Sequence, residues 1–341
     1  MKIAVLYNTA NADVLQHRGP AAYEIFAPAS LERIVTALEE NDHEAVVFEA
    51  DRFLIDRLEN FFGRVPDDEW PGLVFNLAFG IQGEVRYCHV PGILEMIGLP
   101  YLGSGPLGHA LATDKSAAKA IFRHHGLPTP DFMVLHSNEF EAPDFGYPLV
   151  VKPIYGASSI GLRFVHNEQE LRTAVAEILA TLGEPVLVER YLAGREINIG
   201  VLGNQPGLAL LPVEVVVGVE GPPIYTFEDK NGIATRKLEL ICPAPLSDLL
   251  AEQAQTLALQ AFTVLNCRDW ARVEMRLDET GQLQLLEVNT IPGLGARASL
   301  PIAAEKMGMN YAALIQRLVD IVVERYQQQP VAQTLQPKYS K

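Results

Sequence analysis

The segment ARVEMRLDETGQLQLLEVNT, residues 271–290, constrains the fold of this chain more than any other. Apolar and polar residues alternate on both sides of Asp278–Gly281, which is the pattern of two strands joined by a tight turn. We expect an antiparallel hairpin with a two-residue turn at Thr280 and Gly281. Any fold of the chain must therefore bury one face of this hairpin and accommodate the polar side chains of the other.

This register brings four polar side chains to one face of the hairpin. The opposed pairs are Glu274 with Glu287 and Arg272 with Asn289. Two opposed carboxylates repel, and burial raises the pKa of at least one of them unless a cation intervenes. With the amide oxygen of Asn289 they form an oxygen cluster that suits Mg²⁺. The alternative is a solvated acidic face with Arg272 and Arg276, but the loop IPGLGARAS that follows favours close approach of a ligand.

Strand and helix patterns alternate near the N-terminus, which argues for a parallel sheet flanked by helices. The expected elements there are Ile3–Tyr7, Ser30–Glu40, Ala45–Glu49, Leu73–Leu77 and Val90–Ile97. Later helices are expected at Thr113–His125, Glu168–Leu182, Ser247–Leu265 and Asn310–Tyr326, and later strands at Leu149–Lys152, Val186–Glu189 and Glu196–Leu202. We expect an α/β (α+β) protein with an N-terminal α/β domain (1–108), a central lobe (109–191), a C-terminal lobe (192–327) and a flexible tail (328–341).

Composition argues against several classes of protein. The 341 residues carry 27 Lys and Arg against 42 Asp and Glu, a formal charge of −15, so the concentrated basic surface of a duplex-binding protein is not expected. The three cysteines are scattered without metal-binding or disulfide spacing. The opening MKIAVLYN has too short an apolar stretch for a signal peptide, and no window approaches about 18 apolar residues. We therefore expect a cytoplasmic protein with no nucleic-acid or membrane partner.

Two lysines and two glutamates stand where a nucleotide could be bound. In VVKPIYGASSIG, Lys152 ends an apolar strand and precedes a loop of small residues whose N–H groups can reach phosphate oxygens. The alternative for this segment, which does not match GxxxxGK[ST], is a polar surface hairpin. Lys115 opens a helix, where the helix dipole disfavours a cation, so it is either placed for a ligand or solvated. Glu189 and Glu196 follow, and a carboxylate at a strand end can accept from an amine or a sugar hydroxyl.

The order of these residues resembles that of ATP-grasp enzymes, and the chain from about Leu73 to Tyr326 is most similar to the D-alanine:D-alanine ligase family. The motifs that carry the resemblance are GLPYLGSGPLGHALATDK, GLPTP, VVKPIYGASSIG, VLVERYLAGREINIGVLGN, CRDWARVEM and LLEVNTIPG. The resemblance implies an ATP-grasp fold with three subdomains, in which an N-terminal parallel-sheet domain precedes two α+β lobes that enclose ATP. It also implies a homodimer.

The resemblance implies a role for each residue of the nucleotide site. Lys115 and Lys152 resemble the two lysines that hold the phosphates of ATP. The loop Gly156–Gly161, with Ser158 and Ser159, resembles the segment that closes over those phosphates. Glu189 and the backbone near Leu192 resemble the segment that binds adenine, and Glu196 resembles the carboxylate that binds ribose.

The metal ligands and catalytic residues are implied in the same way. Glu274, Glu287 and Asn289 resemble the ligands of two Mg²⁺ ions, with Mn²⁺ as an alternative. The catalytic residues implied are Arg272 at the phosphoryl and tetrahedral groups, Lys230 in the lid and Ser158 in the phosphate loop. The reaction implied is transfer of the γ-phosphoryl group of ATP to a carboxylate, followed by attack of an amine on the acyl phosphate.

The departures from the family concentrate on the substrate side. The family's HGxxGED segment is FGIQGEV here, with Phe79 in place of histidine and Glu84 retained. The lid tyrosine is replaced by Asn231, and the opening YNTANADVLQHRG offers no counterpart for the glutamate that recognises the first D-alanine. The residues expected around the acceptor are Gly293, Ala298 and Ser299. Because an unsatisfied group in a buried polar network costs roughly 1 to 3 kcal/mol, we expect a different amino-acid substrate.

Three functions are therefore considered. The first is an ADP-forming ligase for small-molecule carboxylate and amino-acid substrates, for example one that attaches serine or threonine to mycosporine-glycine. The second is an authentic D-alanine:D-alanine ligase of peptidoglycan synthesis. The third is an ATP-binding regulatory module without turnover, and the strongest argument against it is that every phosphate and metal position is filled.

Overall fold

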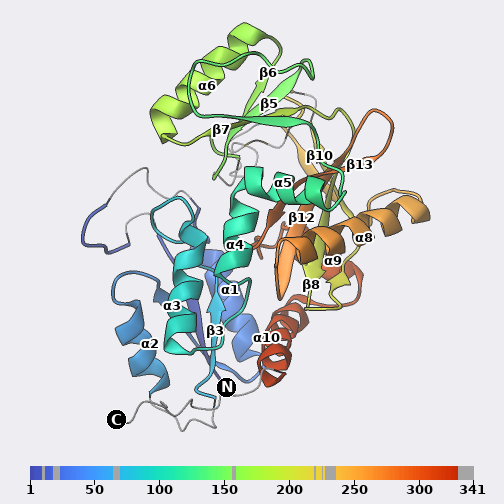
Figure 1. The fold of residues 1–341 in the computed structure, drawn as a ribbon. Coiled ribbons are helices and arrows are strands. Elements are labelled where there is room, and N and C mark those ends of the chain that lie inside the picture. The colour runs from blue at the N-terminus through green and yellow to red at the C-terminus, as the bar shows by residue number, and fades with distance from the viewer. Residues whose placement is uncertain are drawn as a thin grey trace, which may run out of the picture.

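The chain folds into three units, each built on one sheet (Figure 1). The computed structural model describes residues 1–9, 12–17, 24–63, 70–155, 159–218, 220–224, 226 and 236–328. In Figure 1 the N-terminal unit lies at the bottom and the central lobe at the top, and the C-terminal lobe lies on the right between them. Among the described residues, no helix is both long enough and apolar enough to cross a membrane.

The first unit is a parallel sheet with helices on both faces. Its strands are β1 (Lys2–Tyr7), β2 (Glu44–Glu49) and β3 (Leu73–Asn76), in the order β2-β1-β3. Its helices are α1 (Pro28–Glu39), α2 (Leu54–Phe62) and α3 (His89–Ile97), with a short 3-10 helix, η1, at Arg86–Cys88. Ile3 and Val5 share a core with α1, whereas Ala4 and Leu6 share a second core with α2 and α3. The uninterrupted apolar sequence of β1 is therefore buried on both faces, as in other parallel sheets.

The end of the chain returns to this first unit. Helix α10 (Tyr311–Gln327) packs beside α1 and buries its apolar face in the same core as Ile34. Near the end of α10, Arg325 donates to the carboxylate of Asp269, which directly precedes strand β12 (Trp270–Leu277). The N-terminal unit and the C-terminal lobe thus share one core.

The second unit is an antiparallel sheet with one long helix packed against it. Its strands are β4 (Phe132–Leu135), β5 (Leu149–Pro153), β6 (Arg163–Val165) and β7 (Val186–Arg190), in the order β4-β7-β5-β6. Helices α4 (Pro106–Thr113) and α5 (Lys115–His124) precede it in the chain, and α6 (Glu168–Leu182) covers one of its faces. Helix α6 begins where Asn167 accepts a hydrogen bond from the Glu170 N–H, as an N-cap residue does.

The third unit contains the hairpin that the sequence predicts. The antiparallel strands are β8 (Glu196–Leu202), β9 (Leu208–Ala209), β10 (Val213–Val217), β11 (Leu238–Ile241), β12 and β13 (Leu283–Asn289), in the order β11-β10-β8-β12-β13, with β9 beside β8. Its helices are α8 (Asp248–Val264) and α9 (Ser299–Lys306). Helix α8 shares a core with β8 and β12, whereas Leu300 of α9 belongs to the core that continues into the first unit.

The predicted fold class is confirmed, with an N-terminal parallel sheet and two lobes built on antiparallel sheets. The helix expected at Thr113–His125 is wrong at its start, because Asp114 caps a helix that begins at Lys115. Helix α4 precedes it inside the Gly- and Pro-rich stretch, where Pro106 occupies the first turn, the one part of a helix that tolerates proline. The expected boundary after Gly108 therefore lies within α4.

Candidate active site

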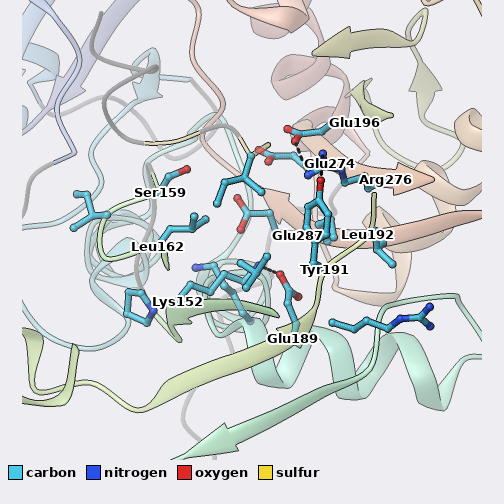
Figure 2. Close-up of a pocket in the computed structure, with 17 residues that line it drawn as sticks. Lys152, Ser159, Leu162, Glu189, Tyr191, Leu192, Glu196, Glu274, Arg276 and Glu287 are labelled. Atoms are coloured by element: carbon cyan, nitrogen blue, oxygen red, sulfur yellow. Dashed lines mark hydrogen bonds and ion pairs between the residues drawn. The ribbon is translucent and has the colours of Figure 1, made fainter. Parts of the chain in front are cut away.

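A solvent-open cleft of about 760 Å³ lies between the second and third sheets. Its walls come from both lobes and from the start of α5 (Figure 2). Figure 2 shows Lys152 and Glu189 on one side and Glu196, Glu274 and Arg276 on the other. The lining residues are Lys115, Val150, Lys152, Pro153, Ser159, Ile160, Leu162, Glu189, Arg190, Tyr191, Leu192, Glu196, Ile224, Glu274, Arg276, Leu286 and Glu287.

The hairpin has the predicted register at the site, but its turn and one of its strands differ from the prediction. Glu274 pairs with Glu287, as predicted. The predicted two-residue turn is wrong, because Asp278 and Gln282 close a loop of residues 279–281, in which Gly281 adopts a positive φ of 80°. This loop would misalign the strands by one residue, but a β-bulge at Leu286 restores the register. Consistent with the bulge, Leu286 and Glu287 both line the cleft.

The opposed carboxylates lie where a cation can reach them. Glu274 is buried and accepts from Arg272 Nε at 3.1 Å, so this carboxylate is partly neutralised. Glu287 lines both the cleft and a smaller adjoining cavity, which Asn289 also lines. The Asn289 amide oxygen accepts from the Ile291 N–H at 3.1 Å and retains a second lone pair. Two carboxylates and an amide oxygen are donors that Mg²⁺ prefers, although no three His, Cys, Asp or Glu side chains of the described residues cluster as a metal site.

Glu189 holds two buried lysines at the base of the cleft. Lys152 Nζ lies 2.5 Å from Glu189 Oε1, and Lys119 Nζ lies 2.9 Å from Oε2. Burial opposes the charge on Lys152, but Glu189, Glu287 and Glu274 together outweigh it and raise the pKa of Lys152. Burial dominates at Lys119 and lowers its pKa to about 8, despite the opposing effect of Glu189. Burial disfavours the carboxylate as well, yet the two lysines hold the pKa of Glu189 below its ordinary value.

The sequence prediction assigned Glu189 to adenine and did not identify Lys119. In the structure both oxygens of Glu189 face buried lysines, since Oε2 lies 2.9 Å from Lys119 Nζ and Oε1 lies 2.5 Å from Lys152 Nζ, although Glu189 also lines the cleft. Lys119 lies four residues after Lys115 and therefore on the same face of α5. That spacing in DKSAAK was the signal that could have identified Lys119.

Lys115 is the first residue of α5 and lines both cavities. Its ammonium group lies 3.4 Å from the Ile154 carbonyl oxygen, and burial lowers its pKa. Asp114 caps the helix by accepting from the Ser116 and Ala117 N–H groups. The cap fixes the start of the helix, and Lys115 at that start contributes to the lining of both cavities.

The end of the cleft beyond β7 carries the residues implied for adenine and ribose. Leu192 is buried and Glu196 opens β8, and both line the cleft. Arg276 was not assigned, although it stands two residues after Glu274 and so on the same strand face. Its Nε donates to the Gly194 carbonyl at 2.9 Å, and its guanidinium lies 3.9 Å from Glu196. These contacts of Arg276 hold the start of β8 beside the cleft.

The residues predicted for substrate contact are placed differently. Phe79 stacks on Phe26 at 5.4 Å between ring centroids and also packs against Tyr87. Glu84 is exposed, and neither it nor Phe79 lines either cavity. The remaining three also line neither cavity: Gly293 lies in the loop between β13 and α9, Ala298 is the N-cap residue of α9, and Ser299 is its buried first residue.

Three predicted residues, Ser158, Lys230 and Asn231, lie outside the described residues. Ser159, next to the first of them, lines the cleft with a positive φ of 60°. A non-glycine residue rarely adopts this conformation. The described part of the loop therefore turns sharply at the mouth of the cleft.

The smaller cavity, with about 360 Å³ of empty space including its opening to solvent, adjoins the acidic pair on its other side. It is lined by Tyr87, Ala112, Thr113, Lys115, Tyr155, Glu287, Val288, Asn289 and Thr290. Behind Tyr87 lies Glu24, a buried glutamate that the sequence did not reveal and that pairs with Arg86. No motif precedes Glu24 that could have marked it.

Comparisons with known proteins give a consistent result. Residues 121–320 match the family described as the D-ala D-ala ligase C-terminus. An uncharacterized protein of Sinorhizobium fredii, y4sG, is 39% identical over 330 residues, which are 96% of this chain and 98% of that protein. A D-alanine–D-alanine ligase of Desulfovibrio desulfuricans is 36% identical over 291 residues, 84% of this chain and 89% of that protein. The crystal structure of the D-alanine–D-alanine ligase from Bacillus anthracis is similar with a TM-score of 0.74 at 25% identity, over 96% of this chain and 99% of that one.

Proposed function

The chain belongs to the D-alanine:D-alanine ligase family of ATP-grasp enzymes, and from this premise we propose that it joins a small-molecule carboxylate to the amine of an amino acid. ATP drives the reaction through an acyl phosphate, and ADP and phosphate are released. The observation that carries the proposal is the convergence of Lys115, Lys152 and the opposed Glu274 and Glu287 on one cleft between two lobes.

The charges of the cleft suit the chemistry. A carboxylate is a poor acyl donor, and it must be brought beside the phosphates of ATP, which repel it. Lys115 and Lys152 bind and neutralise phosphate oxygens, and Arg272 lies beside the acidic pair, where charge develops during transfer. Glu274, Glu287 and Asn289 would hold Mg²⁺, which when bound supplies further neutralisation of the transferring phosphoryl group.

The nucleotide would lie along the cleft with its base at the β7 end. Leu192 supplies apolar surface and backbone groups there, and Glu189 lines the cleft beside it, where the adenine amine would lie. Glu196, at the opposite wall, is placed to accept from ribose hydroxyls. This orientation directs the terminal phosphate to the junction of the two cavities, beside Lys115 and Glu287. The carboxylate substrate then occupies the smaller cavity.

The identity of the substrates is the finer part of the proposal. We propose a carboxylate and an amino acid other than two D-alanines, because the wall of the smaller cavity contains Tyr87 and the segment behind it carries Phe79. A second candidate is the D-alanine:D-alanine reaction, which the printed names of several relatives favour. The two candidates differ in one observation, ADP release with D-alanine as the sole added amino acid.

The function is tested by Mg²⁺-dependent ADP formation in the presence of a panel of carboxylates and amino acids. ADP should form only when a carboxylate and an amine are both present, and Glu287→Gln should lower kcat by at least about 100-fold. Glu305→Gln, on the exposed face of α9, is the matched control and should leave kcat unchanged. ATP binding without ADP formation across the panel would instead support the regulatory module.

A further inference from the structure

A buried arginine of β12 lies in the wall of the cleft and has no role in the proposed reaction. Arg276 is 9% exposed and lines the cleft with Glu196 and Tyr191, which Figure 2 shows close to it. Burial of a guanidinium group is costly unless its N–H donors and its charge find partners. The partners of Arg276 therefore indicate what the side chain does at this end of the cleft.

Two nitrogen atoms of Arg276 hold backbone segments. Its Nε donates to the Gly194 carbonyl at 2.9 Å, two residues before β8, and its Nη2 donates to the Pro223 carbonyl at 2.8 Å. The guanidinium carbon also lies 5.0 Å from the centre of the Tyr191 ring, within the range of a cation–π contact. These contacts fix the guanidinium group relative to three segments of the cleft wall.

The charge of Arg276 faces Glu196. The two residues are register partners in the antiparallel pairing of β12 with β8, so their side chains leave the same face of the sheet. Arg276 Nη1 lies 3.9 Å from Glu196 Oε2, and each side chain is only 11% exposed, so water screens their attraction little. The distance is too long for a hydrogen bond, and Arg276 therefore attracts the carboxylate without occupying one of its acceptor positions.

The segment that contains Pro223 has a second anchor. Ile224 is buried and lines the cleft beside Pro223. Arg236 donates to the Pro222 carbonyl and, at 2.6 Å, to the Ile224 carbonyl. Removal of Arg276 would leave these bonds in place, whereas its attraction for Glu196 would be lost altogether. The effect of Arg276 on Glu196 is therefore the larger of the two.

We propose that Arg276 is a positioning residue for the nucleotide, which holds the Glu196 carboxylate in place to accept hydrogen bonds from the ribose hydroxyls of ATP. This inference rests on the proposed function and adds a residue that determines its sugar specificity. Because the bonds to Gly194 and Pro223 fix the guanidinium group, Glu196 faces a charge of fixed position. A hydroxyl donates a stronger hydrogen bond to an ionised carboxylate than to a neutral acceptor. Arg276 thus acts on the ribose through Glu196.

Nucleotide binding tests the proposal without any need for turnover. MgATP and the magnesium complex of 2′,3′-dideoxy-ATP, which lacks both ribose hydroxyls, are titrated into the full chain by calorimetry. The wild type should bind ATP more tightly by about ten-fold or more, because the hydroxyls donate to an ionised carboxylate. Arg276→Met should reduce this preference by about five-fold or more, through weaker binding of ATP. Any loosening of the wall weakens both nucleotides alike and cancels in their ratio.

The result that contradicts the role of Arg276 is equally clear. Equal weakening of both nucleotides in Arg276→Met, or no weakening of either, would overturn the proposal. Arg317→Met, which breaks an exposed ion pair on α10, is the matched control and should leave the preference unchanged. If Arg276→Met does not fold, Arg276→Gln takes its place with the same prediction, since glutamine is neutral but can still donate to a carbonyl.

A double variant tests the dependence on Glu196. Glu196→Ala should remove the preference for ATP, and the addition of Arg276→Met should reduce it no further. A further loss in the double variant would show that Arg276 acts on the ribose without Glu196. A preference retained in Glu196→Ala would show that this carboxylate does not bind the ribose. Either result overturns the proposal.

The role of Arg276 and the ligase function fail separately. ADP formation by a wild type that does not prefer ATP to the dideoxy nucleotide would overturn the role of Arg276 and leave the ligase function intact. A preference that depends on Arg276, without ADP formation from any carboxylate and amine, would overturn the ligase function and leave the role of Arg276 in nucleotide binding.

Discussion

At the scale of single residues, burial and ion pairing show which charged side chains matter at the site, and a sequence motif marks only some of them. Lys119 matches no assigned role in the family resemblance, yet it is fully buried and completes the ion-pair arrangement around Glu189. Lys152 and Lys115 were predicted from sequence because they border a loop and a helix start. Lys119 was missed, although its spacing four residues after Lys115 could have identified it. Glu24 could not be predicted, since its importance arises from Arg86, a partner that lies far away in the chain.

Lys119 can be tested directly. In Lys119→Met, Glu189 keeps one cation instead of two, so Lys152 is drawn towards Glu189 and away from phosphate oxygens. We expect the KM for ATP to rise by about ten-fold, equivalent to roughly 1.4 kcal/mol, with a smaller change in kcat. Lys306→Met, at an exposed site on α9, is the matched control. An unchanged KM in a folded Lys119→Met protein would show that Lys119 has no part in positioning Lys152.

The pKa of His109 predicts how the stability of the folded protein depends on pH. Burial, and then the charge of Arg268, lowers its pKa from 6.5 to about 3, so the unfolded chain binds a proton at this residue below about pH 6.5 whereas the folded chain does not. Proton binding to the unfolded chain therefore lowers the free energy of unfolding as pH falls from about 6.5 towards 3, by up to about 1.4 kcal/mol per pH unit. Urea unfolding at pH 7.5 and pH 5.5 should show a smaller loss for His109→Gln than for the wild type. Equal losses of stability in the two proteins would show that the proton responsible binds to another residue.

At the scale of elements, the β12–β13 hairpin shows what a sequence pattern can and cannot determine. Alternation predicts both strands and their facing side chains, and the pairing of Glu274 with Glu287 follows. Neither the loop of residues 279–281 nor the compensating bulge at Leu286 could be predicted, because each alone shifts the register by one residue and the pattern is compatible with both solutions. The bulge is specified by contacts from another segment.

That segment is the loop after α5. The Pro128 carbonyl accepts from the Leu285 N–H at 2.8 Å, and the Thr129 hydroxyl donates to the Leu285 carbonyl at 2.8 Å. Lys119 in turn donates to Thr129 Oγ1 at 2.8 Å. This chain of hydrogen bonds connects the lysines of the cleft to the residue that precedes the bulge, and so to the strand that carries Glu287.

Thr129→Val tests this connection. The substitution retains shape but removes the hydroxyl, so a buried carbonyl and a buried lysine each lose a partner, at a cost of about 1 to 3 kcal/mol. We expect a lower melting temperature and a several-fold loss in kcat/KM, whereas Thr129→Ser should retain both. Loss of stability without any loss of kcat/KM would show that the loop after α5 does not affect the active site.

At the scale of the whole molecule, the first and third units are joined by a shared hydrophobic core and by one buried carboxylate, that of Asp269. Asp269 is fully buried and accepts from Arg325 of α10, from the Gly103 N–H and from the side chain of Asn204. These partners come from the C-terminal helix, the end of the first unit and the third unit. The sequence predicts three units, but the docking of the first on the third depends on such long-range polar contacts and on a shared core, which no local pattern encodes.

Asp269→Asn should therefore weaken the assembly of the units. Asparagine tolerates the positive φ of 66° at this position, so the change removes charge with little backbone strain. Arg325 is left buried without its counter-charge, at a cost of about 3 to 5 kcal/mol. Asp131→Asn, which breaks an exposed pair with Arg123, should cost at most about 1 kcal/mol. Equal shifts in melting temperature for the two variants would contradict this assignment of Asp269.

The central claim is that a carboxylate substrate is activated by phosphoryl transfer in the cleft, and an isotope experiment tests it most directly. The donor carboxylate, once identified by ADP release, is labelled with ¹⁸O and incubated with MgATP and the amine. Attack of a carboxylate oxygen on the γ-phosphorus makes that oxygen the bridge of the acyl phosphate, and attack of the amine on the acyl carbon expels it with phosphate. The account predicts one ¹⁸O atom per molecule of inorganic phosphate; amide formation with unlabelled phosphate would contradict it.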